Sequence, residues 1–289
     1  MVFLWTDKIA ASFFVFLIKY DFSLMTSFSS KNVWITGASS GIGEALVYVF
    51  SKKGAMLILS ARNVKELERV KNNCSFPEKV HIFPLDISNH SQVFDVGKKI
   101  MNQFKTIDVL INNAGVSQRS LAAETSFDVD ESLIATNFLG TVAVTKSILP
   151  GMIAKEAGQI VVITSIVGKI GTPLRSSYSA SKHALHGFFD SLRTEVYDKN
   201  INVLLVCPGF VKTNVSINAL NATGAKQGTM DVATEKGLSA DYVAEKIIKA
   251  IVAKKEEVII AGTKEKLGVI LKRFVPKLFS KIIRKSKVT

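Results

Sequence analysis

The sequence predicts an α/β fold: a doubly wound parallel sheet of the Rossmann-like kind, with helices on both faces. Short apolar runs alternate with stretches of helical periodicity through the first two-thirds of the chain. The first apolar run leads at once into a glycine-rich turn and a helix. At 289 residues and 47% hydrophobic composition, the chain can bury one large core. We therefore predict one catalytic domain over residues 31–263, an N-terminal extension, 1–30, and a C-terminal tail, 264–289.

Each element of this fold has its own pattern. The first helix of the domain is expected from Glu44 to Lys53, where Gly54 ends it. Two longer helices are expected around 130–157 and 175–200. Seven parallel strands are expected at the apolar runs near Val33, Leu57, Ile82, 109–111, Val161, 203–206 and 258–260.

The glycine-rich turn predicts a phosphate site. Glycines let the backbone approach a pyrophosphate closely, and the free N–H groups and dipole of the helix that follows favour its negative charge. An ordinary glycine turn is the alternative for this segment taken alone. The predicted contacts are Gly37, Ser39, Ser40, Gly41, Ile42 and Gly43.

A tyrosine and a lysine four positions apart, Tyr178 and Lys182, share one face of a predicted helix. An ammonium beside a phenol makes the ionised phenol easier to reach, so we expect Lys182 to lower the pKa of Tyr178. Such pairs are also common on solvated helix faces. Ser165 supports the catalytic interpretation, because it ends the buried strand near Val161, where open α/β sheets bind ligands.

Five motifs, in this order, resemble the short-chain dehydrogenase/reductase superfamily. They are the glycine turn in the form Thr-Gly-x-x-x-Gly-Ile-Gly, the run 112–115 (Asn-Asn-Ala-Gly), Ser165, the Tyr178-x-x-x-Lys182 pair, and 208–209 (Pro-Gly). The likeness extends over residues 31–260. It implies an oxidoreductase that interconverts a carbonyl and a secondary alcohol with a nicotinamide dinucleotide.

The resemblance also implies residue roles. Tyr178 would be the general acid, Ser165 would polarise the carbonyl oxygen, Lys182 would hold the nicotinamide ribose, and Asn137 would position a water for proton relay. Asp86 would contact the adenine, although a helix cap is an equal structural interpretation. The remaining implied cofactor contacts are Ile87, Asn113, Ala114, Gly115, Pro208, Gly209, Val211 and Thr213, together with Tyr178 and Lys182.

The choice of cofactor is argued from charge. No carboxylate ends the second strand, where one would bind the 2′-hydroxyl of NAD. Arg62 stands there instead, and its planar cation suits a 2′-phosphate, so NADP(H) is predicted. The alternative is a solvated surface arginine. One departure is that Ser39 and Ser40 occupy a stretch in which many NADP-preferring relatives carry a second basic residue.

Cys74 and Cys207 are too few and too isolated for a disulfide framework, and the histidines show no ligand spacing, so no metal is predicted. A cytoplasmic location is expected, either in solution or at the cytoplasmic face of a membrane. The apolar run 10–17 is too short to span a bilayer. The N-terminal residues have two equal interpretations: translation starts at Met25, or the segment before it contacts a membrane.

The tail, 264–289, predicts a basic amphipathic helix that Pro276 kinks or divides. Such a helix suits an anionic membrane surface. Packing on the enzyme's own core or on a second subunit is the alternative. The formal net charge of +13 would attract any polyanion, but the tail's large aliphatic side chains favour lipid, so nucleic acid is not expected.

The long segment after Phe210, together with the run 239–244, resembles the dehydrogenase/reductase family member 7B branch, whose members are membrane-associated. The leading hypothesis is thus an NADP(H)-dependent reductase of a lipophilic or lipid-linked ketone. A soluble 3-oxoacyl or steroid-type reductase and a catalytically silent membrane-bound scaffold are the alternatives. In relatives the helices 130–157 and 175–200 commonly build a dimer face, so a homo-oligomer is expected.

Overall fold

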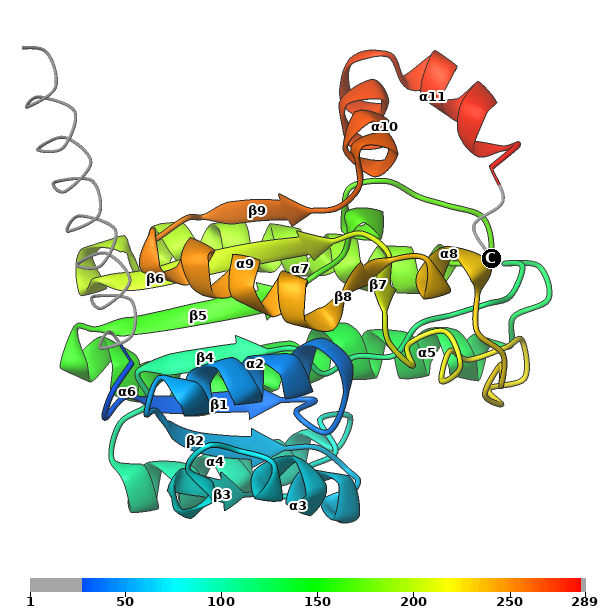
Figure 1. Ribbon diagram of the computed structural model, residues 1–289. Helices are drawn as coiled ribbons and strands as arrows, with labels where there is room; N and C mark the ends of the chain where they lie inside the picture. Colours follow the sequence, from blue (N-terminus) through cyan, green and yellow to red (C-terminus); the bar gives the residue numbers. More distant parts are fainter. Residues whose placement is uncertain (1–27, 287–289) are drawn as a thin grey trace, which may run out of the picture.

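The computed structural model describes residues 28–286, and its centre is a parallel sheet of seven strands (Figure 1). The strands are β1 Asn32–Thr36, β2 Met56–Ser60, β3 Val80–Ile82, β4 Val109–Asn112, β5 Gly158–Ile163, β6 Ile201–Pro208 and β9 Glu257–Ile260. Their order is β3-β2-β1-β4-β5-β6-β9, and every pair is parallel. The predicted α/β fold and its seven strands are confirmed. The strand order reverses between β1 and β4, where such sheets bind ligands.

Helices cover both faces of the sheet. The α-helices are α2 Gly41–Lys52, α3 Val64–Asn72, α4 His90–Phe104, α5 Phe127–Ile134, α6 Thr141–Lys155, α7 Ser176–Glu195, α8 Val232–Glu235, α9 Ala240–Val252, α10 Thr263–Phe274 and α11 Pro276–Ile283. Short turns are η1 Pro77–Lys79, η2 Ala135–Gly140, η3 Ile166–Gly168 and η4 Tyr197–Lys199, and a small pair joins β7 Val211–Lys212 to β8 Leu238–Ser239.

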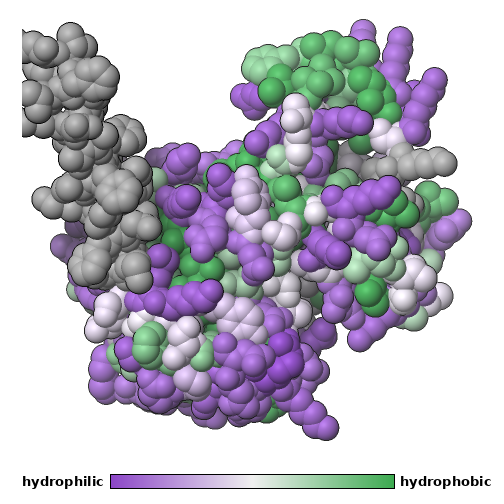
Figure 2. Space-filling model, in the orientation of Figure 1, coloured by the Kyte–Doolittle hydropathy of each residue, from purple (hydrophilic) through white to green (hydrophobic). Residues whose placement is uncertain are grey.

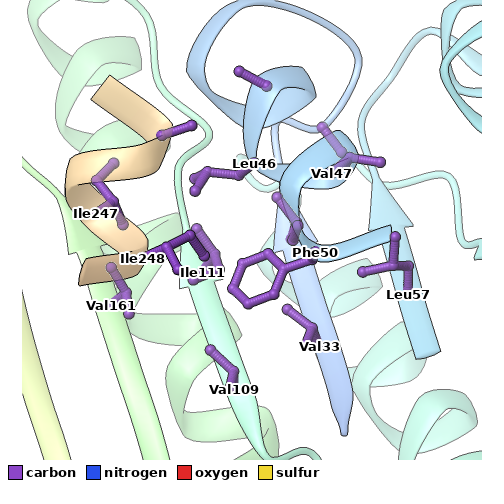
Figure 3. Close-up of a cluster of buried hydrophobic side chains, with 14 of the residues drawn as sticks. Val33, Leu46, Val47, Phe50, Leu57, Val109, Ile111, Val161, Ile247 and Ile248 are labelled. Carbon is purple, nitrogen blue, oxygen red and sulfur yellow. The ribbon is translucent and has the colours of Figure 1, made fainter. Parts of the chain in front are cut away.

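The core has two layers because side chains alternate along each strand. From β1, Val33 points to the face covered by α2 and α9, where it meets Phe50 and Ile248 (Figure 3). Trp34 points to the opposite face, which α4, α6 and α7 cover. The indole Nε1 of Trp34 donates a hydrogen bond to Ser60 Oγ at 2.9 Å, so its one polar group is satisfied inside the core.

The helix predicted around 130–157 extends from Phe127 to Lys155 and contains one π-helical stretch, η2. π-Helical turns are frequent at functional sites, and η2 carries Asn137. Of the chain from 28 to 286, this is the one helix that is long and apolar enough to cross a membrane. Its side chains Val144, Ile148 and Met152 lie in the core, so packing accounts for its apolar character.

The end of the chain forms two helices rather than one. α10 ends at Phe274, Val275 leaves the helical region with a φ of −135°, and Pro276 begins α11. Proline fits a first helical position because its missing N–H would have no partner there. The predicted division at Pro276 is confirmed. The expectations about a start at Met25 and a membrane-touching N-terminal segment concern residues outside the described part of the chain.

Candidate active site

A pocket of about 790 Å³ opens at the carboxyl ends of the strands, where β1 and β4 diverge. Its volume lies within the range of small-molecule and cofactor sites. All but two of the predicted site residues line it. The lining set is Gly37, Ser39, Ser40, Gly41, Ile42, Arg62, Asp86, Ile87, Asn113, Ala114, Gly115, Ser165, Tyr178, Lys182, Pro208, Gly209, Val211 and Thr213. Gly43 and Asn137 lie behind the pocket wall.

The glycine turn forms a cradle at one end of this pocket. Gly37 and Gly41 have positive φ angles of 64° and 60°, which side chains rarely adopt. A Cβ on Gly43 would stand 2.2 Å from the carbonyl oxygen of Gly37, so only glycine allows this approach of α2 to the turn. The N-cap residue Ser40 makes no side-chain capping bond. The first N–H groups of α2 therefore remain available to a pyrophosphate, and the cradle fits a dinucleotide.

Thr36 and Asn113 brace this cradle from behind. The hydroxyl of Thr36 accepts hydrogen bonds from the backbone N–H groups of Asn113 and Ala114, at 3.1 and 3.2 Å. The amide Nδ2 of Asn113 donates to the carbonyl oxygens of Thr36 and Gly37, at 3.1 and 3.0 Å. The loops after β1 and β4 are thereby held together, so Asn113 acts through the shape of the pocket.

The tyrosine and lysine of α7 meet the serine at the end of β5, as the motif predicts. Burial raises the pKa of Tyr178, while a hydrogen bond with Ser165 and the charges of Arg175 and Arg119 favour its ionised form. Lys182 Nζ donates to the carbonyl oxygen of Ile163 at 2.8 Å, and burial lowers the pKa of Lys182 to about 8. A phenol, a hydroxyl and a titratable amine thus line one wall, as proton transfer to a carbonyl oxygen requires.

The structure does not support the prediction that Lys182 lowers the pKa of Tyr178. The Lys182 ammonium is bound to a backbone carbonyl and lies 5.9 Å from the centre of the Tyr178 ring. The cations that favour the ionised form of Tyr178, against the larger effect of burial, are Arg175 and Arg119, neither of which we predicted from the sequence. Spacing on a helix places two side chains on the same face, but it does not determine which atoms they contact.

Asn137 is fully buried and holds two segments together. Its Oδ1 accepts from the N–H of Val116 at 2.8 Å, and its Nδ2 donates to the Val116 carbonyl and to Ser181 Oγ, at 2.9 and 3.0 Å. The side chain therefore joins the pocket loop after β4 to helix α7. Both N–H bonds of Nδ2 and one acceptor site of Oδ1 have protein partners.

Asp86 does not cap a helix. Its Oδ1 accepts from the backbone N–H and the hydroxyl of Ser88, at 3.0 and 2.7 Å. The N-cap of α4 is Asn89, whose side chain accepts from the N–H of Gln92 at 3.1 Å. The capping alternative is wrong, and Asp86 stands in the pocket wall beside Ile87.

A buried ion cluster next to the pocket was not predicted from the sequence. Arg119 donates from Nε and Nη2 to Asp231 Oδ2, at 2.9 and 2.5 Å, and Arg175 Nη2 lies 3.6 Å from the same oxygen. The three side chains are 5% exposed or less. Asp231 belongs to the long segment after β7, so the cluster fastens that segment to the loops before α5 and α7. No local pattern joins residues 112 positions apart.

The structure also brings His186, Cys207 and Glu257 together, a cluster that the spacing of these residues did not predict. His186 Nε2 lies 3.8 Å from Cys207 Sγ, and its Nδ1 lies 3.7 Å from Glu257 Oε2. The Glu257 carboxylate is ion-paired with Lys169 at 2.6 Å. Burial raises the pKa of Cys207 to about 11 and, with the Lys169 charge, lowers that of His186 to about 4. Both groups are therefore neutral at pH 7.

His186 is expected to make the protein less stable in mild acid. Its pKa in the folded state lies below the unfolded value, 6.5. Between these two pKa values the unfolded chain binds a proton at this histidine and the folded chain does not. The free energy of unfolding therefore decreases as the pH falls from 6.5 to about 4. The loss is about 3 kcal/mol. Urea unfolding at pH 7 and pH 4.5 should show a smaller pH difference in His186→Gln. The exposed neighbour replacement His183→Gln should leave that difference unchanged; an equal effect of both variants would refute the assignment.

The fold and this pocket define an oxidoreductase that uses a nicotinamide dinucleotide. A glycine cradle at the first helix, next to a serine, a tyrosine and a lysine at a strand end, has the parts that hydride transfer to a carbonyl needs. The family model described as short chain dehydrogenase matches residues 31–223. The chain belongs to the short-chain dehydrogenase/reductase family.

Known relatives agree in sequence over most of the chain. A dehydrogenase/reductase SDR family protein 7-like from Drosophila melanogaster is 41% identical, over 89% of this chain and 81% of its own. The dehydrogenase/reductase SDR family member 7B of Bos taurus is 40% identical, over 87% of this chain and 79% of its own. The resemblance to this branch is confirmed.

Solved structures agree in fold. A short-chain dehydrogenase from Streptomyces avermitilis has a TM-score of 0.76 and 26% identity, and the match covers 90% of this chain and 100% of that one. A short chain dehydrogenase/reductase from Burkholderia phymatum, solved in complex with NAD, has a TM-score of 0.76 and 23% identity, with 87% and 95% covered. The central sheet and its helices are therefore those of the family.

Proposed function

We propose that this protein is an NADP(H)-dependent reductase that converts a lipophilic or lipid-linked ketone to a secondary alcohol. The observation that carries the proposal is the meeting of Ser165, Tyr178 and Lys182 in one pocket with the glycine cradle. A scaffold without chemistry would not need a buried lysine in the same pocket as a partly buried phenol, since removing such groups from water costs free energy.

The three side chains divide the work on the carbonyl. The bound dinucleotide would supply a hydride. Ser165 donates a hydrogen bond to the carbonyl oxygen, and Tyr178 donates the proton that this oxygen needs as it becomes a hydroxyl. Lys182, whose Nζ is held on the carbonyl oxygen of Ile163 in the same pocket and whose pKa burial lowers to about 8, would bind the nicotinamide ribose.

Arg62 favours the phosphorylated cofactor. It is exposed at the pocket rim after β2, beside Ser60 and Ala61, and no acidic residue stands among the four positions 60–63. Glu66, a lining carboxylate four residues further along the chain, is ion-paired with Arg69 at 2.7 Å. Arg69 also reaches the carbonyl oxygen of Ser39 at 3.4 Å, so a second guanidinium lies near the glycine turn although the turn itself carries none.

Apolar side chains beside the catalytic residues favour a lipophilic substrate. Val116, Val215 and Leu220 line the pocket together with polar side chains such as Asn214 and Asn218. The apolar residues Ile166 and Val167 follow Ser165 directly. These apolar groups would contact the hydrocarbon part of a ketone, and the polar ones would orient it. The soluble 3-oxoacyl or steroid-type alternative shares this chemistry and differs in the shape of the substrate.

Replacing Arg62 by alanine is expected to weaken NADPH binding about tenfold to a hundredfold, because charge-assisted hydrogen bonds to the 2′-phosphate are worth about 1.5–3 kcal/mol. NADH has no such phosphate, so its affinity should change by less than about twofold. The measurement is a titration with each cofactor that follows nicotinamide fluorescence. Lys65→Ala removes an exposed cation of α3 outside the pocket and should change neither affinity. A wild-type preference for NADH, or equal losses for both cofactors in Arg62→Ala, would overturn the NADP(H) proposal.

A further inference from the structure

The helices α10 and α11 form a hairpin with two distinct apolar faces, here named the C-terminal hairpin (263–283). Its inner face packs on the turn that follows the catalytic Ser165. Phe279 is 5% exposed and lies in one apolar cluster with Ile166, Val167 and Ile170. The partly buried Tyr178 packs against the same cluster. The hairpin is thus seated on the enzyme's own body, as one alternative from the sequence expected, but this inner face uses only part of its apolar residues.

The outer face of the hairpin is apolar and exposed. Figure 2 shows hydrophobic side chains gathered at the free end of the molecule formed by α10 and α11, with hydrophilic ones around them. On α10 the exposed residues follow one helical stripe, and on α11 they are spaced four apart. Their exposed fractions are Leu267 52%, Ile270 54%, Phe274 76%, Val275 45%, Leu278 44% and Ile282 47%. Phe274 and its neighbours therefore remain without a partner in the described chain.

Positive charge surrounds this apolar face. The hairpin and the two residues after it carry eight lysines and arginines: Lys264, Lys266, Lys272, Arg273, Lys277, Lys281, Arg284 and Lys285. None of these forms an ion pair within residues 28–286. The lone acid, Glu265, accepts from the N–H groups of Phe210 and Gly262, at 2.8 and 2.6 Å. The hairpin therefore carries a large excess of positive charge over its single carboxylate.

We infer that the C-terminal hairpin binds the surface of an anionic lipid bilayer through its outer face and so holds the substrate side of the active site against the membrane. Apolar side chains would enter the boundary between headgroups and acyl chains, and the lysines and arginines would contact the lipid phosphates. This goes beyond the reductase proposal and does not depend on it, because lipid binding is measured without turnover.

The charges favour lipid over the two other partners. A second copy of the hairpin would bring two sets of unpaired cations together, which costs free energy unless anions intervene. A nucleic acid would meet the cations but leave large aliphatic groups such as Ile270 and Leu278 in water. An anionic bilayer satisfies both kinds of side chain at once.

Two contacts tie the docking surface to the active site. Ile170 lies five residues after Ser165, and a Cβ on Gly268 of α10 would meet its Cδ1 at 3.7 Å. Glu265 holds the N–H of Phe210, the residue after the pocket-lining Gly209. The apolar cluster on which the hairpin is seated therefore also contacts Tyr178 of the pocket.

The test is flotation of the full-length protein with vesicles of phosphatidylcholine alone or with added phosphatidylserine. The wild type should float with the anionic vesicles and lose most of that binding at high salt. The double variant Ile270→Gln, Phe274→Gln should bind at least about tenfold more weakly, since burial of each side chain is worth more than that factor. Lys277→Gln with Lys281→Gln should weaken anionic binding and leave binding to neutral vesicles unchanged.

The matched control is Tyr197→Ser, which removes an aromatic side chain of similar exposure, 79%, from η4. It should float like the wild type. Unchanged thermal midpoints and NADPH affinity in all variants would exclude misfolding. Equal flotation of the wild type and the Ile270/Phe274 variant would overturn the inference. A loss of oligomer size in that variant, without any lipid binding by the wild type, would also overturn it and assign the outer face to a second copy.

Discussion

Tyr178→Phe is expected to lower kcat for ketone reduction by about 10²–10⁴-fold, because the variant keeps the ring but loses the proton donor. Dinucleotide affinity should stay within about twofold, since the glycine cradle and Arg62 are untouched. The measurement is NADPH oxidation with ketones of increasing chain length, next to a binding titration. The wild-type kcat/KM should rise with chain length if the substrate is lipophilic.

The control for this change is Tyr197→Phe, which removes an exposed hydroxyl outside the pocket and should leave turnover unchanged. Turnover by Tyr178→Phe at the wild-type rate would exclude Tyr178 as the acid. A wild type that binds NADPH but turns over no ketone would instead favour the scaffold alternative. The two results are distinguishable, because the first leaves an active enzyme with another donor and the second leaves none.

Asp231→Ala is expected to destabilise the fold by about 3–5 kcal/mol. It leaves the guanidinium groups of Arg119 and Arg175 close together in the protein interior without the carboxylate between them. Arg119 already disfavours the charge on Arg175, and burial lowers the pKa of Arg175 to about 10. The thermal midpoint should fall by roughly 10 °C in a domain of this size.

The matched control is Asp190→Ala. Asp190 is 54% exposed and pairs with Arg193 at 2.7 Å, so its loss should cost less than about 1 kcal/mol. Equal destabilisation by the two variants would refute a special role for the buried cluster. Because Asp231 anchors the segment after β7, Asp231→Ala should also raise KM for the ketone at temperatures where it remains folded, which Asp190→Ala should not.

The parts of the predicted site that the structure brings together in one pocket are those with local patterns. The glycine turn, Ser165 and the Tyr178 and Lys182 pair lie where the strand and helix patterns place them, because carboxyl ends of parallel strands share one edge. The division of the tail at Pro276 is equally local, since proline lacks the N–H that a continuing helix would use.

Contacts between distant segments could not be predicted in the same way. The capping alternative for Asp86 is wrong because the N-cap of α4 is Asn89, which only the structure shows. The expectation that Lys182 lowers the pKa of Tyr178 depended on where the ammonium points, and it points to the carbonyl of Ile163. Such directions depend on packing around the side chain and not on its position in a motif.

Local sequence patterns and tertiary contacts thus determine different features of this protein. The order of apolar runs, glycines and motif residues defined the family and its oxidoreductase class, because periodicity and short spacing can be recognised in the sequence alone. The tertiary structure decided that Arg119, Arg175 and Asp231 share one buried cluster, that His186 meets Cys207, and which face of the C-terminal hairpin is exposed. These features join residues far apart in the chain, and only the packed fold brings them within the few ångströms over which hydrogen bonds and ion pairs act.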